Sequence, residues 1–119
     1  MKFPSWYGII IGGMIILQWI FFLVNDAVPE LQTTPWAFGF HISAELLLAL
    51  SLIEGGIGTL RSTSWGEKTL LVALGMAIYS EINSSGYFAQ LGQWAFIVMF
   101  AVLLFGATLS VMVLLKKGR

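Results

Sequence analysis

Four long apolar stretches, separated by short polar segments, make up most of this chain. They extend over residues 6–24, 37–60, 69–89 and 94–115. A helix of about 20 apolar residues crosses the hydrocarbon core of a bilayer, so each stretch is long enough for a transmembrane helix. None of them has the two-residue alternation of a membrane β-strand. The pattern therefore predicts an all-α membrane protein in which residues 1–119 form a single transmembrane domain.

The connections between these stretches are short, with residues 25–36, 61–68 and 90–93 left over. Short connections make consecutive helices antiparallel neighbours. The fold class predicted from the sequence is therefore an up-down bundle of four transmembrane helices.

The basic residues indicate the orientation of this bundle. All six precede the first stretch, separate the second from the third, or follow the fourth: Lys2, Arg61, Lys68, Lys116, Lys117 and Arg119. Lysine and arginine favour the cytoplasmic side of membrane proteins. We therefore expect cytoplasmic N- and C-termini in a multi-pass protein of the plasma (inner) membrane. Aromatic side chains prefer the membrane surface, which places Trp6, Tyr7 and Trp65 at the inner interface and Trp36, Tyr87 and Trp94 at the outer one.

Composition agrees with a lipid environment. The chain is 58% hydrophobic and 10% charged, whereas soluble domains contain roughly a quarter charged residues. Its net charge is zero, so we expect no nucleic-acid partner. The absence of cysteine excludes disulfides and thiolate metal sites. The stretch 6–24 is longer than the apolar part of a signal peptide and no small-residue cleavage site follows it, so we expect it to remain as a helix.

Candidate chemistry lies towards the predicted outer side of the membrane. Ionisable groups are costly inside a bilayer, and each one is a functional candidate for that reason. The candidates for a ligand site are His41, Glu45, Glu81, Asn83 and Asp26. No basic residue is expected on this side to neutralise the carboxylates.

The sharpest local motif is His41-Ile-Ser-Ala-Glu45. Residues four apart share one face of a helix, about 6 Å apart along its axis, so this pair could share a proton or bind one metal ion. With Glu81 as a third ligand, the set suits a divalent cation such as Mg²⁺, Mn²⁺, Fe²⁺ or Zn²⁺. The alternative is a hydrogen-bonded pair that only orders the bundle. Glu81 is buried if the third helix continues to Ala89, and lies among lipid headgroups if it ends at Ile82.

Glycines mark two further features. Gly8 and Gly12 form a face that lets another helix approach closely, either inside the bundle or in a homodimer. Gly55, Gly56 and Gly58 predict that the second helix frays or ends near the inner surface.

Two resemblances add to this interpretation. The segment Gly75–Phe105, with its core Ile82-Asn83-Ser84-Ser85-Gly86-Tyr87-Phe88-Ala89-Gln90, resembles small uncharacterised four-helix membrane proteins of prokaryotes, which implies no particular function. The positions of Asp26, His41 and Glu45 are similar in layout to the emopamil-binding (EXPERA) superfamily. That resemblance implies a buried acidic site for lipid-soluble ligands.

The sequence supports two functions from different classes. In the first, the outer His/Glu cluster binds or transports a cation, a proton or a small cationic or apolar ligand. A chain with four helices would need to form a homo-oligomer to enclose a transport path. In the second, the bundle is a structural or accessory subunit of a larger membrane complex without chemistry of its own. An enzyme that uses a His41–Glu45 proton relay ranks last, because nothing in the sequence specifies a reaction.

Overall fold

The computed structural model describes residues 2–25 and 30–117 of the chain. Four long helices contain nearly all of them: α1 (Lys2–Val24), α3 (Pro35–Leu60), α4 (Gly66–Gln90) and α5 (Trp94–Lys117). The four predicted helices are thus confirmed. A short helix, α2 (Glu30–Thr33), lies within the first connection and was not predicted.

Most helix ends extend beyond the predicted limits. The clearest case is α4, which has 25 residues and is therefore about 37 Å long, compared with the roughly 30 Å thickness of bilayer hydrocarbon. Hydropathy detects only the apolar middle of such a helix. The start of α3 has a local cause, because Pro35 in the first turn has its φ angle already fixed and has no N–H group to leave unpaired.

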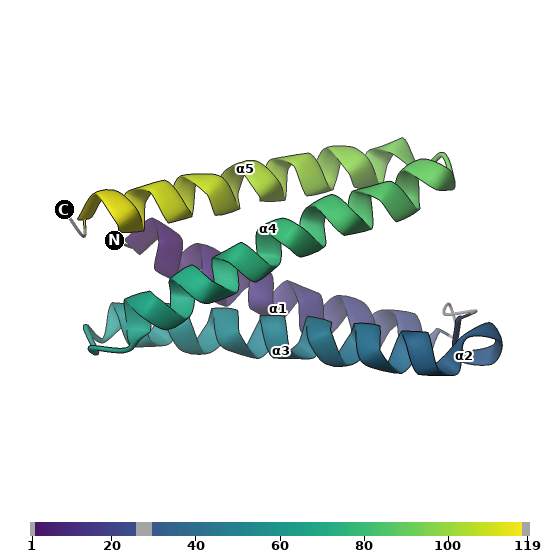
Figure 1. Ribbon diagram of the computed structural model, residues 1–119, viewed down its shortest axis with the longest axis horizontal. Helices are drawn as coiled ribbons and strands as arrows, with labels where there is room; N and C mark the ends of the chain where they lie inside the picture. The colour runs from purple at the N-terminus through teal and green to yellow at the C-terminus, as the bar shows by residue number, and fades with distance from the viewer. Residues whose placement is uncertain (1, 26–29, 118–119) are drawn as a thin grey trace.

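Consecutive long helices pack side by side and alternate in direction (Figure 1). Both ends of the described chain therefore lie together with the connection 61–65. We call this end of the bundle the basic end, because it contains Lys2, Arg61, Lys68, Lys116 and Lys117. The opposite end, with α2 and the connection 91–93, is called the α2 end.

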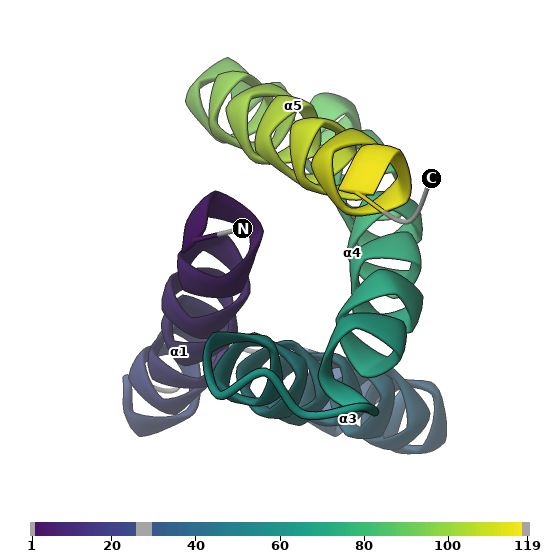
Figure 2. The ribbon, with the colours of Figure 1, turned by 90° about the vertical axis from the view of Figure 1, so that its left-hand side faces the viewer.

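The bundle is not uniformly packed. Helix α4 lies against α3 at the basic end and against α5 towards the α2 end (Figure 1). Seen along the bundle, α1, α3, α4 and α5 surround a central space, and α1 and α5 diverge away from the basic end (Figure 2). The helices are therefore closely packed at one end and spread at the other.

Three of the four long helices, α1, α3 and α5, are long and apolar enough to cross a membrane. Helix α4 has the length but is more polar, with a run of hydrophilic side chains at Ser80, Glu81, Asn83, Ser84 and Ser85. The prediction of four apolar spans is thus met by three helices. Whether α4 is suited to a membrane depends on whether its polar side chains face outwards or face the interior of the bundle.

Helix α3 remains helical through Gly55, Gly56 and Gly58, without the fraying offered as one alternative, and ends at the predicted limit, Leu60. These glycines allow close contact on both sides of the helix. A Cβ atom on Gly55 would lie 2.6 Å from the backbone nitrogen of Leu70 in α4, and one on Gly56 would lie 2.6 Å from the backbone oxygen of Ser5 in α1. Glycine therefore brings three helices together at the basic end.

The glycine face of α1 packs within the bundle. A Cβ atom on Gly8 would lie 2.9 Å from the backbone oxygen of Leu52, and one on Gly12 would lie 2.7 Å from the backbone oxygen of Ala49. Both contacts are with α3. Of the two alternatives for this face, the structure contains the one inside the bundle.

Candidate functional site

A cavity of about 920 Å³ lies between the four long helices and extends to the α2 end. Its wall is mostly apolar and receives aromatic side chains from every long helix: Trp19, Phe22, Phe38, Phe88, Phe96 and Phe100. It forms where the helices diverge, on the far side of the glycine contacts. Cavities of this size accommodate drug-sized molecules.

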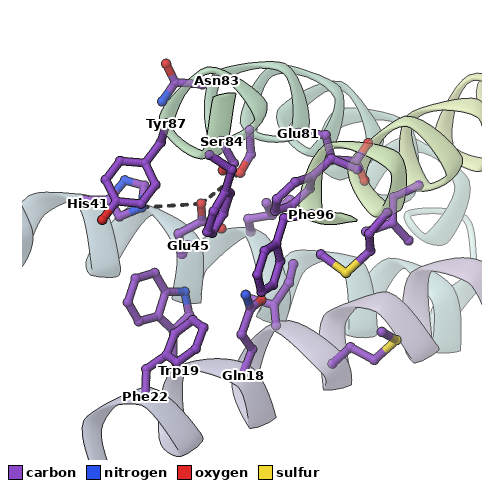
Figure 3. A pocket seen from close by; sticks show the side chains of 18 of the residues that line it. Gln18, Trp19, Phe22, His41, Glu45, Glu81, Asn83, Ser84, Tyr87 and Phe96 are labelled. Carbon is purple, nitrogen blue, oxygen red and sulfur yellow. Dashed lines mark hydrogen bonds and ion pairs between the residues drawn. The ribbon is translucent and has the colours of Figure 1, made fainter. Parts of the chain in front are cut away.

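Glu45 of α3 is 9% exposed and lies on the cavity wall. The hydroxyl of Ser80 in α4 donates a hydrogen bond to its Oε1 atom over 2.8 Å. The Nε2 atom of His41 is 3.7 Å from the same oxygen, and the ring of Trp19 meets the imidazole edge-on. The structure thus brings the predicted pair together, with His41 at the more open position (Figure 3).

Glu81 of α4 is 6% exposed. Because α4 continues to Gln90, the buried alternative for this carboxyl group is the correct one. The hydroxyl oxygen of Tyr7 in α1 lies 3.1 Å from its Oε2 atom. Its Oε1 atom is buried and has no hydrogen-bond partner among the described residues.

Tyr7 was expected at the membrane interface, yet its side chain reaches into the bundle. Its hydroxyl donates a hydrogen bond to the backbone carbonyl of Leu103 in α5. The absence of a side chain at Gly106 makes room for the ring, since a Cβ atom there would lie 2.6 Å from Cε2 of Tyr7. A glycine inside an apolar helix was the one sign of this contact in the sequence.

The remaining predicted residues contribute less. Asn83 is exposed and lies at the rim of the cavity, with its amide directed away from the two carboxyl groups (Figure 3). Asp26 lies outside the residues that the structure describes, and its predicted role is untested.

The structure does not assemble the predicted metal triad of His41, Glu45 and Glu81. Within residues 2–25 and 30–117, no three His, Cys, Asp or Glu side chains are grouped closely enough to hold a metal ion. The reason is the direction of Glu81, whose carboxyl group lies within hydrogen-bond distance of Tyr7 and points away from His41 (Figure 3). The geometry instead presents two separate carboxyl groups to one large cavity.

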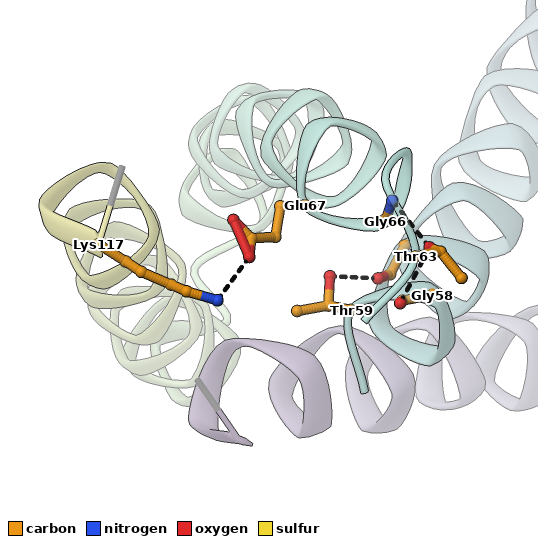
Figure 4. A network of polar contacts seen from close by, with 7 residues as sticks. Gly58, Thr59, Thr63, Gly66, Glu67 and Lys117 are labelled. Atoms are coloured by element: carbon orange, nitrogen blue, oxygen red, sulfur yellow. Dashed lines mark hydrogen bonds and ion pairs between the residues drawn. The ribbon is translucent and has the colours of Figure 1, made fainter. Parts of the chain in front are cut away.

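The lysines and arginines that the structure describes all lie at the basic end, opposite the cavity. No lysine or arginine lines the cavity in the described part of the chain. At the basic end, Lys117 of α5 forms an ion pair with Glu67 of α4 over 2.8 Å, so its charge is already paired away from the cavity (Figure 4). The turn between α3 and α4 is held there by Thr63, whose hydroxyl donates to the carbonyl of Gly58 and accepts from the amide of Gly66. Among residues 2–25 and 30–117, the two acidic groups of the cavity thus have His41 as their one potential cationic neighbour.

The chain belongs to a family described as a domain of unknown function (DUF8058), whose model matches residues 1–119. No curated protein and no solved structure matches the chain. The family agrees with the expectation of an uncharacterised protein. The comparisons give no link to the emopamil-binding superfamily or to a particular group of prokaryotic proteins.

Proposed function

We propose that this is an integral membrane protein whose four long helices all span the bilayer and whose cavity binds a lipophilic organic cation. The polarity of α4 is consistent with a spanning helix, because Ser80, Glu81, Asn83 and Ser84 all line the cavity. Polar side chains in membrane proteins face the interior of the bundle or a cavity in this way.

The outer surface supports a lipid environment. Large apolar side chains are exposed on every long helix, among them Leu17 at 67%, Phe40 at 75%, Val72 at 66% and Phe105 at 66%. Soluble monomers rarely expose extended apolar surface. In a bilayer the same surface contacts acyl chains at no hydrophobic cost.

The orientation we propose has the basic end in the cytoplasm and the α2 end outside the plasma membrane. Because the chain has no cysteine, single cysteines report on each end without background. Ser64 is exposed at the basic end, and Gln32 is exposed at the α2 end. In intact cells a membrane-impermeant maleimide should label Gln32→Cys at once, and Ser64→Cys only after permeabilisation. The reverse pattern would contradict the orientation, and equal labelling of both would contradict a spanning bundle.

The observation that carries the ligand proposal is the buried carboxyl group of Glu81: the residue lines the aromatic cavity, and its Oε1 atom has no hydrogen-bond partner among the described residues. Buried polar atoms normally have a partner. Aromatic faces attract organic cations, and two carboxyl groups without a lysine or arginine beside them favour positive charge. The volume and apolar wall fit an organic cation better than a bare metal ion.

Tetraphenylphosphonium is a suitable probe, because it is cationic, apolar and aromatic. It should raise the thermal unfolding temperature of the protein in lipid nanodiscs in a concentration-dependent way, as any ligand of the folded state does. Ser84→Trp, which fills the cavity, should abolish this increase. Tyr79→Trp is the matched control: Tyr79 belongs to the same helix but is 74% exposed, so this variant should respond like the wild type.

A cavity between diverging helices could also receive a transmembrane helix of a larger complex, which is the accessory-subunit alternative. The unpartnered carboxyl oxygen favours a charged small ligand instead. If the wild type, Ser84→Trp and Tyr79→Trp are all unaffected by tetraphenylphosphonium, the ligand proposal is wrong and the accessory role is favoured.

A further inference from the structure

The contacts of Tyr7 specify where a proton lies in the cavity. A tyrosine hydroxyl has one proton to donate. Its oxygen is within hydrogen-bond distance of two acceptors, the backbone carbonyl of Leu103 and Oε2 of Glu81. A backbone carbonyl can only accept, so the contact with Leu103 uses the proton of Tyr7.

The contact with Glu81 then needs a second proton. Two oxygens 3.1 Å apart form a hydrogen bond only if one of them donates, and an ionised carboxylate cannot donate. A protonated Glu81 donates to the hydroxyl oxygen of Tyr7 and makes all three groups compatible. Its other oxygen, Oε1, is then the carbonyl oxygen of a neutral acid. Burying such an oxygen without a partner costs far less free energy than burying a charged carboxylate oxygen.

The groups that face Glu81 agree with a neutral carboxyl. Helix α1 provides Tyr7, and α5 provides the carbonyl of Leu103. Helix α3 provides Glu45 and, beyond it, His41. Glu45 accepts the hydrogen bond from Ser80, and a second carboxyl group nearby makes it costly for both to be ionised. Among the described residues no lysine or arginine of any packed helix reaches the cavity to compensate.

We infer that Glu81 holds a proton while the cavity is empty and exchanges it for the organic cation on binding. This inference rests on the proposed function and adds that binding of the cation is coupled to release of a proton. The O–H bond of the carboxyl group breaks, and the proton leaves through the cavity to water at the α2 end. The carboxylate that remains pairs with the cation. The net charge of the site is the same before and after, so the exchange adds no buried charge to the cavity.

The first test counts protons. Tetraphenylphosphonium added to the protein in weakly buffered nanodiscs should release about one proton per cation bound, and affinity should rise about tenfold per pH unit wherever Glu81 is protonated in the empty protein. Glu67→Gln, which alters an acid at the basic end away from the cavity, should still release this proton. Binding without proton release in the wild type would overturn the exchange and leave the proposed function standing.

A second measurement does not depend on binding. The infrared spectrum of the empty wild type minus that of Glu81→Gln should contain the C=O stretch of a protonated carboxylic acid. The same difference made with Glu67→Gln, whose carboxyl group pairs with Lys117 at the basic end, should lack this band. Carboxylate bands for Glu81 would overturn the inference. If the protonated band is present but tetraphenylphosphonium does not bind, the proposed function fails and the exchange fails with it, while the protonation of Glu81 stands.

Discussion

Replacing Glu81 with glutamine should weaken tetraphenylphosphonium binding by about 100-fold or more. Glutamine keeps the shape of the side chain but cannot become negative, so the cation would be buried opposite a neutral amide. Removing one partner of a buried ion pair costs about 3–5 kcal/mol, which corresponds to roughly two to three and a half orders of magnitude in the dissociation constant. Equilibrium binding of the radiolabelled cation to protein in nanodiscs measures this directly.

Folding should survive the substitution, because a protonated glutamate and a glutamine are both neutral. Glu67→Gln is the matched control: Glu67 belongs to the same helix and pairs with Lys117 at the basic end, away from the cavity. Its affinity should equal that of the wild type. Glu45→Gln should weaken binding less than Glu81→Gln, since Ser80 already donates to Glu45. If Glu81→Gln bound the cation with wild-type affinity, the carboxyl group of Glu81 would not be part of the binding site.

A second large effect should come from one methyl group at the basic end. In Gly55→Ala the new Cβ atom would lie 2.6 Å from the backbone nitrogen and 2.7 Å from Cα of Leu70. Backbone atoms cannot move aside as a side chain can, so α3 and α4 must separate. Overpacking of this kind typically costs about 1–3 kcal/mol. The thermal unfolding temperature in nanodiscs should fall accordingly.

Gly75→Ala provides the comparison. Gly75 is also inside a long helix, but a Cβ atom there would meet nothing within 4 Å. Alanine favours the helix over glycine by up to about 1 kcal/mol, so this variant should be as stable as the wild type or more so. Equal destabilisation by both substitutions would show that close contact at Gly55 does not hold the helices together.

The four long helices could be predicted because continuous apolar runs and short connections leave few alternatives. Their packing could not. Gly55, Gly56 and Gly58 have the local signature of a helix end, and only the neighbouring backbones of Ser5 and Leu70 explain why α3 continues through them. The cavity has the same origin, since it depends on where glycine lets the helices meet and where aromatic side chains keep them apart.

Site residues were predictable when the relation was local. His41 and Glu45 are four residues apart on one helix, and they do face each other. The metal triad is not assembled among the described residues, because the direction of Glu81 depends on the rotation of α4 against α1. Tyr7 was missed because the preference of tyrosine for the membrane interface already explained its presence near the start of a helix. Its partner Leu103 is 96 residues away in the sequence, so no local pattern indicates the contact.

The central claim is that an organic cation occupies the cavity next to Glu45 and Glu81. Crystals of the protein grown with tetraphenylarsonium would test it most directly, because the anomalous scattering of arsenic locates the cation independently of any model of the protein. The account predicts an arsenic peak inside the cavity, between the two carboxyl groups and the aromatic side chains of its wall. Arsenic found only on the outer surface of the bundle, with the cavity empty, would contradict it.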